Sequence, residues 1–292
     1  MNRLTALLLG IFAVASPVLA GTDKNTAPAE EKTSIDLFTY EANYIFPSDT
    51  RAEGGRRGQQ DEVWNHFSYG HRFQISGQWY LRAGLDLQRY DFGSSKLPLP
   101  SRLQGYAGTI AVEYVEQDYA GAALELHPGA YFEDSTRDSF DIAWDAYSGF
   151  VIRKDKLFGI VGVAGARFYS FPVYPIFGVI WLVNDKLRIE AVVPKSTIVY
   201  SLNDDWEFDL VGEFTGAGFR AGVNEVPRLS HAAVEYYDSR LTAQFTYSRW
   251  KPLKITGGFG WIFNRTFDYF NAGEKFSSNG APCLKFGVEA RF

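Results

Sequence analysis

The last ten residues of the chain constrain its fold most strongly, because apolar and other side chains alternate there without a break. One set comprises Leu284, Phe286, Val288, Ala290 and Phe292, and the other comprises Cys283, Lys285, Gly287, Glu289 and Arg291. Successive side chains of a β-strand point to opposite faces, so the stretch predicts a strand with one apolar and one charged face. A soluble sheet shows this pattern over a core, and a membrane barrel shows it against lipid.

An aromatic residue ends both this strand and the chain, which favours the membrane. Phe292 is placed to lie at a bilayer interface. A C-terminal Phe preceded by apolar residues at every second position, here Val288 and Ala290, resembles the assembly signal of bacterial outer-membrane β-barrels. The resemblance implies recognition by the barrel-assembly machinery. The sequence therefore predicts a closed barrel in the outer membrane of a Gram-negative bacterium, with lipid outside and a polar lumen.

The N-terminus predicts export. Arg3 precedes an apolar run from Leu4 to Val14, and a small-residue cleavage site ends at Ala20, as in a secretory signal peptide. The run is shorter than the roughly 20 apolar residues that a membrane-spanning helix needs. The predicted organisation is a signal peptide over residues 1–20, a periplasmic tail over 21–34 and a single barrel domain over 35–292.

The composition agrees with a barrel wall in which only alternate residues meet lipid. The mean hydropathy is −0.17, which is too polar for a helical membrane protein. Aromatic residues make up 16% of the chain, as expected for strands with aromatic belts. The single cysteine excludes an internal disulfide, and the net charge of −5 argues against nucleic acid as a partner.

Alternation and turn residues predict about fourteen strands in an antiparallel up-and-down barrel, with twelve as the alternative. The segments are 35–46, 63–75, 79–90, 105–116, 119–133, 140–153, 157–169, 175–183, 187–193, 196–202, 206–219, 231–249, 253–270 and 281–292. With the N-terminal tail in the periplasm, every connection on that side is two or three residues long. Those on the outer side are longer, except at Pro194, as outer-membrane barrels require.

Aromatic residues cluster at the predicted periplasmic ends of the strands. They are Trp79, Phe158, Trp181, Trp206 and Trp250, together with Phe292. Aromatic side chains favour the headgroup layer of a bilayer, so we interpret this set as a periplasmic aromatic belt.

One stretch carries a more specific pattern. Its residues are Pro175, Gly178, Trp181, Asn184, Asp185, Pro194 and Tyr200, and a second patch covers 260–265. Together they resemble a family of exported bacterial β-barrel proteins of unknown function. The resemblance implies a fold and a location, but no activity and no catalytic residues.

Charged residues on the inward side of several strands are the candidate lumen lining. They are Glu207, Asp209, Glu213, Lys254, Lys285, Glu289 and Arg291. Mixed charges inside a barrel line a watery pore and set its selectivity, or pair with one another and block it. Both alternatives stay open at the level of the sequence.

Catalytic chemistry has little support. His66 and His71 are five residues apart on one strand and point to opposite faces. Ser68 shares a face with His66, but no third group is evident that would orient a base. His127 and His231 are interpreted as structural. We therefore predict no enzyme activity, no metal and no cofactor.

The short strands between Pro175 and Leu202 suggest a notch in the outer wall, through which an apolar ligand could leave sideways. The alternative is a bulge at Pro194 within one long strand, which would leave thirteen strands.

The leading hypothesis for function is a porin-like barrel for passive passage of small solutes through the charged lumen. A second is a non-conducting structural or adhesive barrel whose outer loops bind lipopolysaccharide or a partner. A lipid-modifying enzyme using Ser68 and a histidine is a third. Outer-membrane lipids and lipopolysaccharide are the expected surroundings, and the sequence does not fix the oligomeric state.

Overall fold

The computed structural model describes residues 34–292 apart from 53, 54, 56 and 118. The predicted signal peptide and all but the last residue of the predicted tail lie outside the described residues. The described part is all-β, with one short 3-10 turn, η2 (Pro227–Leu229). Its strands are β1 (Ser34–Ala52), β2 (Arg57–Ser76), β3 (Trp79–Phe92), β4 (Arg102–Gln117), β5 (Ala120–Phe132), β6 (Phe140–Arg153), β7 (Leu157–Gly165), β8 (Val173–Leu182), β9 (Leu187–Val193), β10 (Lys195–Ser201), β11 (Trp206–Arg220), β12 (Ala233–Tyr247), β13 (Leu253–Tyr269), β14 (Glu274–Ser278) and β15 (Ala281–Arg291).

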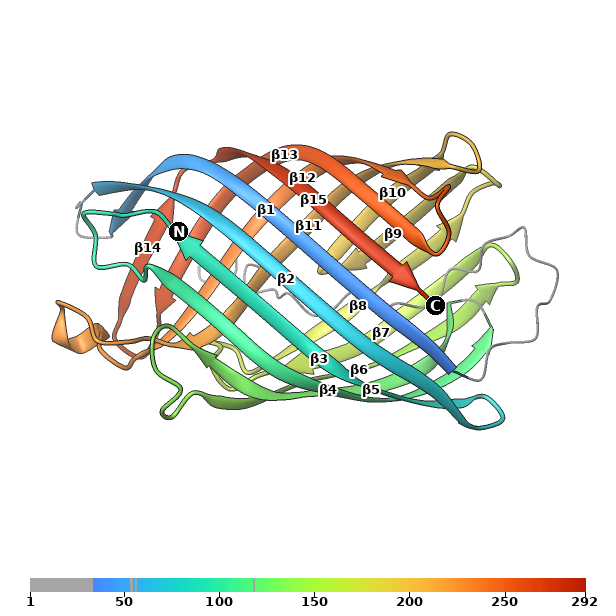
Figure 1. Ribbon diagram of the computed structural model, residues 1–292, viewed down its shortest axis with the longest axis horizontal. Helices are drawn as coiled ribbons and strands as arrows, with labels where there is room; N and C mark the ends of the chain where they lie inside the picture. Colours follow the sequence, from blue (N-terminus) through green and yellow to red (C-terminus); the bar gives the residue numbers. More distant parts are fainter. Residues whose placement is uncertain (1–33, 53–54, 56, 118) are drawn as a thin grey trace.

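The strands form a closed antiparallel barrel of fourteen wall positions (Figure 1). The last strand pairs with the first, from Leu37 opposite Arg291 to Ile45 opposite Cys283. β14 and β15 both lie between β13 and β1, so they are two parts of one wall strand. The prediction of a fourteen-stranded up-and-down barrel is confirmed.

The two ends of the barrel differ as the sequence indicates. Short turns gather with the C terminus at the right of Figure 1, and longer loops gather at the left. Gly77 and Asp155 take the positive φ angles that tight turns require. We refer to the short-turn end as the periplasmic end and to the opposite end as the outer end, following the usual architecture of such barrels.

Several predicted boundaries are wrong at the outer end. Residues 47–62 were expected to form a loop, but β1 and β2 continue through most of them, with Asp49 opposite Gln59. Polar strand residues pair equally well outside lipid, so a change to polar composition does not end a strand there. β14 likewise extends the last wall strand into the predicted loop 271–280, whereas β7 ends at Gly165, four residues early.

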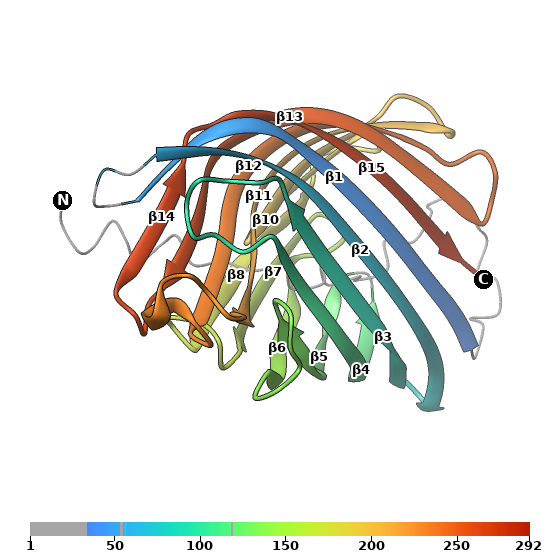
Figure 2. The ribbon, with the colours of Figure 1, turned by 60° about the vertical axis from the view of Figure 1, so that its left-hand side comes forward.

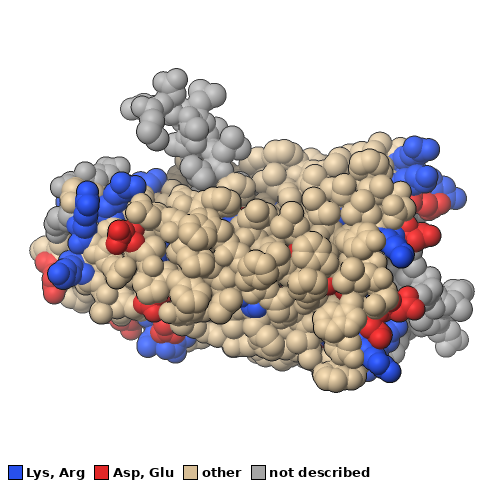
Figure 3. Space-filling model, turned by 90° about the horizontal axis from the view of Figure 1, so that it is seen from above, with Lys and Arg blue, Asp and Glu red and all other residues tan. Residues whose placement is uncertain are grey.

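The outward face of the wall is apolar. Trp79 and Leu85 on β3, and Leu284 and Phe286 on β15, are exposed on this face. Figure 3 shows a broad uncharged surface, with charged residues gathered toward the two ends. This is the surface of a bacterial outer-membrane β-barrel, in which apolar side chains face lipid. No helix among the described residues is long and apolar enough to cross a membrane.

The predicted aromatic belt needs one correction. The exposed members at the periplasmic end are Trp79, Trp181, Trp206, Trp250 and Phe292. Phe158 is only 2% exposed, because alternation along β7 places it on the inner face with Ile160 and Ala164. Both faces of β7 are apolar, so composition alone did not distinguish them. The position of the remaining residues in a headgroup layer stays a prediction.

The wall is interrupted where the notch was predicted. β9 and β10 have seven residues each, and they pair with each other on either side of Pro194. The alternative of one long strand through Pro194 is therefore wrong. At about 3.3 Å per residue and a tilt near 40°, seven residues rise roughly 18 Å, less than the roughly 25 Å apolar band of such barrels. The β8 ladder with this hairpin ends at Phe177, and the β11 ladder ends at Glu213. The parts of β8 and β11 that lie closer to the outer end have no ladder partner from the hairpin.

The loop between β7 and β8, residues 166–172, covers this interruption. The Phe168 carbonyl lies so close to Gly218 of β11 that a Cβ there would come within 2.1 Å of its oxygen, so only glycine fits. Ser170 donates its backbone N–H (3.1 Å) and its hydroxyl (2.6 Å) to Glu235 of β12. Glu235 points outward, yet this loop leaves it only 2% exposed. We call residues 166–172 the covering loop.

Arg220, the last residue of β11, pairs with Phe132, the last residue of β5. This contact lies at the outer end of the barrel, and Figure 2 turns that end toward the viewer. Glu133, just beyond β5, donates its N–H to the Arg220 carbonyl (3.0 Å), and its carboxylate accepts from the Gly222 N–H (2.8 Å). Burial raises the pKa of the Glu133 carboxyl, and the Gly222 N–H acts in the opposite direction. The barrel is therefore narrowed at its outer mouth.

Candidate functional site: the lumen and its outer mouth

Two of the predicted lumen charges meet inside the barrel. Lys285 Nζ lies 3.5 Å from Glu41 Oε2 and 3.8 Å from Glu213 Oε1, and Arg240 Nε lies 3.8 Å from the same Glu213 oxygen. All four residues come from different strands of one side of the wall. These inward charges pair with one another. Of the two alternatives, a lining of unpaired charges and a set of paired charges, this group follows the second.

The other five predicted charges do not join this group. Asp209 accepts a hydrogen bond from Thr246 (3.4 Å), and Glu207 accepts one from Ser201 (3.5 Å). Lys254 on β13 and Glu289 on β15 occupy facing register positions. Glu289 and Arg291 are exposed toward the periplasmic end.

A second charged network, which the sequence interpretation missed, lies on β2 to β5. Glu113 accepts a hydrogen bond from Arg82 (2.8 Å) and forms an ion pair with Arg72 (2.8 Å), and Arg82 also donates to Glu125 (2.6 Å). The signal was present, because Arg82 lies on the inward side of the alternating segment 79–90.

A third network fixes the closing seam near the outer end. Arg265 of β13 is 1% exposed and donates to Gln60 O (2.6 Å), Ser48 Oγ (2.9 Å) and Ser278 Oγ (3.2 Å). Its Nη1 lies 3.4 Å from Glu62 Oε2. The guanidinium thus ties β13 to β1, β2 and β14.

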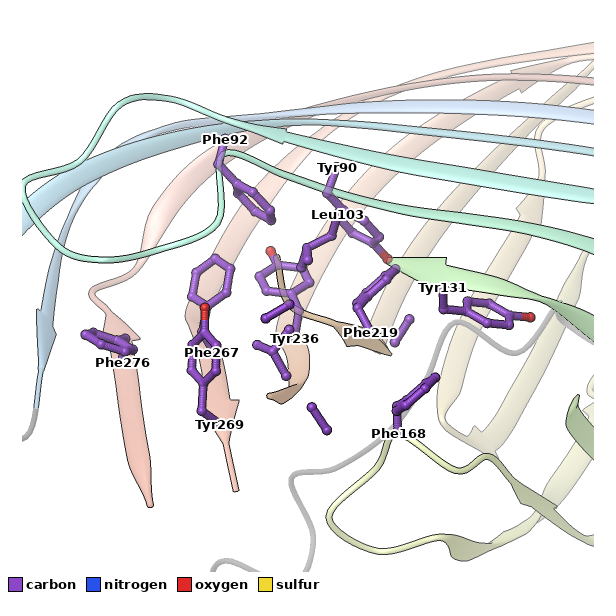
Figure 4. Packing of buried hydrophobic residues seen from close by; sticks show 14 of the residues in the cluster. Tyr90, Phe92, Leu103, Tyr131, Phe168, Phe219, Tyr236, Phe267, Tyr269 and Phe276 are labelled. Carbon is purple, nitrogen blue, oxygen red and sulfur yellow. The ribbon is translucent and has the colours of Figure 1, made fainter. Parts of the chain in front are cut away.

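Aromatic side chains fill the lumen at the outer end. We call this set the outer aromatic cluster; its largest members are Trp64, Tyr90, Phe92, Tyr131, Phe168, Phe219, Tyr236, Phe267, Tyr269 and Phe276. Figure 4 labels all of these except Trp64 and shows rings from several strands and from the covering loop gathered in one region. The ring centres of Tyr90 and Tyr236 are 5.0 Å apart, as are those of Phe92 and Phe267. An apolar plug therefore occupies the outer mouth.

A second apolar surface lines the inside of β7 to β9, and we call it the inner apolar wall. Its members are Tyr119, Phe158, Ile160, Ala164, Tyr174, Ile176, Ile180 and Val192. Inward apolar side chains are unusual for a barrel with a water-filled lumen, whose inner face is polar. In the sequence, this surface corresponds to strands such as β7 and β8, which have apolar residues on both faces.

A cavity of about 50 Å³ joins the two apolar surfaces. Tyr131 and Ala217 belong to the outer aromatic cluster, Tyr174 belongs to the inner apolar wall, and all three line the cavity. Gly165 and Gly218, at the interruption of the wall, line it as well. Asp86, His127 and Asp145 form its polar side.

The fold and the inward-facing groups of the described residues define a β-barrel of the bacterial outer-membrane class. No family model matches the chain, and no curated protein is similar to it. The predicted membership of a family of unknown function is therefore not confirmed, although the broader expectation of an outer-membrane barrel is.

Among solved structures, the chain is similar to an outer membrane channel from Pseudomonas putida F1, with 12% identity, a TM-score of 0.48, and coverage of 89% of this chain and 95% of that one. It is also similar to TodX, the toluene transporter of Pseudomonas putida (11%, TM-score 0.39, 88% and 89% covered). A FadL homologue from Pseudomonas aeruginosa gives 10% identity, a TM-score of 0.35, and 89% and 90% coverage. Similarity at this level does not define a function for this chain.

Proposed function

We propose that the protein is a channel for passive passage of small apolar molecules, which enter at the outer aromatic cluster and leave sideways beneath the covering loop. The observation that carries the proposal is the cavity that joins the outer aromatic cluster to the inner apolar wall at the interruption between β8 and β11. The leading hypothesis from the sequence was passive passage of small solutes through the charged lumen. The proposal keeps passive passage, but the solute is apolar and leaves through the wall.

The outer aromatic cluster supplies the affinity for an apolar solute. Aromatic side chains offer large apolar surfaces and ring-to-ring contacts, which recognise a small aromatic molecule. Phe168 belongs to the cluster and lies on the covering loop rather than on a strand. Movement of this loop therefore changes the packing of the cluster and opens the cavity behind it.

The interrupted wall supplies the exit. The β9–β10 hairpin ends below the height of a full apolar band, so the covering loop is the barrier between the cavity and the outer part of the membrane. Transfer of an apolar solute from water through this cavity into lipid is favourable overall, by roughly 25 cal/mol per Å² of apolar surface removed from water. No energy source is needed.

The charged lumen favours this route over an open ionic pore. Lys285 pairs with both Glu41 and Glu213, and Arg82 bridges Glu113 and Glu125. An ion crossing the centre would have to break such pairs. Small apolar molecules that leave through the wall do not have to pass these paired charges.

The test is uptake of radiolabelled toluene, a small apolar probe, by Gram-negative cells that express the barrel. Wild type is expected to raise the initial rate several-fold over cells without it. Ala217→Trp places a large side chain at the cavity and is expected to return the rate to that of cells without the barrel. Ala83→Trp, on the exposed outward face of β3, is the matched control and is expected to behave as wild type.

Heat-dependent migration on gels verifies that each variant is folded. A folded Ala217→Trp barrel with wild-type uptake would contradict the route. Discrete ion-conductance steps in a planar bilayer, combined with no toluene uptake, would favour the open charged pore instead.

A further inference from the structure

Three potential metal ligands converge on the inner face of β5 and β6, next to the cavity. Glu125 and His127 are two residues apart on β5, and Asp145 of β6 stands opposite Glu125 in the ladder. His127 Nε2 lies 3.3 Å from Glu125 Oε1 and 3.8 Å from Asp145 Oδ2. One ligand atom from each of the three residues lies within 4.8 Å of the others. We call these residues the Glu-His-Asp cluster.

Two carboxylate oxygens of the cluster lack a hydrogen-bond partner. Glu125 Oε1 and Asp145 Oδ1 are buried, and neither has a partner among the residues that the structure describes. The two residues are 3% and 2% exposed. A protonated His127 carries one Nε2–H, which can serve only one carboxylate, and neither distance is that of a good charged hydrogen bond. A cation held by Glu125 Oε1, His127 Nε2 and an Asp145 oxygen gives Glu125 Oε1 the partner that it lacks and balances the buried carboxylates.

The surrounding groups orient the ligands as they do in known metal sites. Arg82 Nη2 donates to Glu125 Oε2 at 2.6 Å, which leaves Oε1 turned toward His127. Thr109 Oγ1 lies 3.4 Å from His127 Nδ1. A proton held on Nδ1 toward this hydroxyl leaves Nε2 with a free lone pair, and such outer partners typically fix the tautomer of a ligating histidine.

Space and charge fit a metal ion with bound water. His127 and Asp145 line the cavity of about 50 Å³, which exceeds the roughly 10–15 Å³ needed to hold one water. Glu113 and Glu125 pair with two arginines, Arg72 and Arg82, and Asp145 beside His127 leaves one negative charge while the imidazole is neutral.

We propose that the Glu-His-Asp cluster binds one divalent transition-metal ion of the Zn²⁺ class, with water from the cavity as the remaining ligand. Tetrahedral Zn²⁺ with bonds near 2.0–2.2 Å spaces its ligands roughly 3.3 Å apart, close to the observed separations. The site joins β5 to β6 inside the lumen. The proposal departs from the expectation of no metal, and it does not depend on the proposed passage of apolar molecules.

The test is isothermal titration of the metal-stripped, detergent-purified full barrel with Zn²⁺ alone. Wild type is expected to bind one equivalent with a saturable isotherm. His127→Gln and Asp145→Asn each remove one ligand and are expected to weaken binding at least tenfold. His71→Gln is the matched control, because His71 also contacts an acidic residue, Asp36 (2.9 Å), but at the exposed periplasmic end. It is expected to bind Zn²⁺ as wild type does.

Two results would overturn the metal site. One is the absence of stoichiometric binding by wild-type barrel that migrates as folded protein. The other is equal affinity for wild type, His127→Gln and Asp145→Asn, which would place the bound ion elsewhere. If the isosteric Asp145→Asn barrel alone folds, its affinity relative to His71→Gln decides the question.

Discussion

The wall of the barrel is closed in different ways at the seam and at the interrupted sector of β9 and β10. At the seam, β1 pairs with β15 from Leu37 to Ile45, and β14 continues the ladder from Thr50 opposite Ser278 to Ala52 opposite Phe276. At the interrupted sector, the ladder stops at Pro194 and the covering loop takes its place. One side of the wall is continuous backbone pairing, and the other depends on a few side chains.

This difference implies that the stability of the wall is uneven. Regions with few ladder bonds open locally at a lower free energy than the continuous sheet. The seam holds a buried guanidinium with four neighbours, whereas the covering loop is held by Asp141, which accepts from Arg167 N–H at 2.8 Å, and by Glu235. A rigid frame with one weakly held segment allows a solute to leave without unfolding the barrel.

The largest effect is expected at the seam. Arg265→Met removes the cation from a site where Glu62 is buried, and leaving a buried charge unpaired costs about 3–5 kcal/mol. Urea unfolding of the detergent-solubilised barrel should show a loss of this size in the free energy of unfolding. Arg137→Met, in the exposed β5–β6 loop, is the control and should stay within about 0.5 kcal/mol of wild type. A loss below about 1 kcal/mol for Arg265→Met would show that the seam does not depend on this residue.

A smaller and local effect is expected at the covering loop. Glu235→Ala removes the acceptor of both Ser170 hydrogen bonds, and a hydrogen bond to a charged group contributes about 1.5–3 kcal/mol. Amide hydrogen exchange of residues 166–172 should therefore accelerate roughly tenfold or more. Exchange at Ala42 and Phe286, paired across the seam, is the internal control and should not change. Equal acceleration at both places would mean that the two sectors open together.

The smallest effect is expected at the two turns that carry the short hairpin. Asn184 Oδ1 accepts from the N–H groups of Lys186 and Leu187 at 2.9 Å each, and Asn203 does the same for Asp205 and Trp206 at 3.0 Å. Asn184→Ala and Asn203→Ala should each lower the free energy of unfolding by about 1 kcal/mol.

Asn271→Ala, in the exposed β13–β14 loop, is the matched control for these turns and should change the free energy of unfolding by less than about 0.5 kcal/mol. Urea titration of all three variants side by side makes the comparison. If the two turn variants match Asn271→Ala, the short strands do not depend on their turns.

Much of the wall was predictable from alternation, because each strand residue has only two faces to occupy. The outward row of β15 and the short hairpin around Pro194 follow directly from that rule. The rule did not place Phe158 correctly because β7 is apolar on both faces, and periodicity does not tell which of two apolar faces meets lipid. The rule also did not predict the polar extension of β1, because strand pairing continues outside the membrane, where side chains need not alternate between apolar and polar.

The lumen was less predictable, because alternation tells which side a residue faces and not which residue it meets. Glu62 and Arg265 are 203 positions apart, and their meeting depends on the stagger of strands around the closed barrel. The Glu-His-Asp cluster depends on the register of only one strand pair, β5 with β6. Alternation places Glu125 and His127 on one inward face, but the sequence does not show that Asp145 lies beside them.

The position of Cys283 allows closure of the barrel to be followed by thiol labelling. It is the single cysteine of the chain, and it is buried on the last wall strand beside Ile45 and Ile262. A membrane-permeant maleimide should modify the thiol while the last strand is unpaired and lose access once that strand closes on the first. Labelling yield against time therefore measures the completion of the cylinder in a native sequence, with no engineered probe.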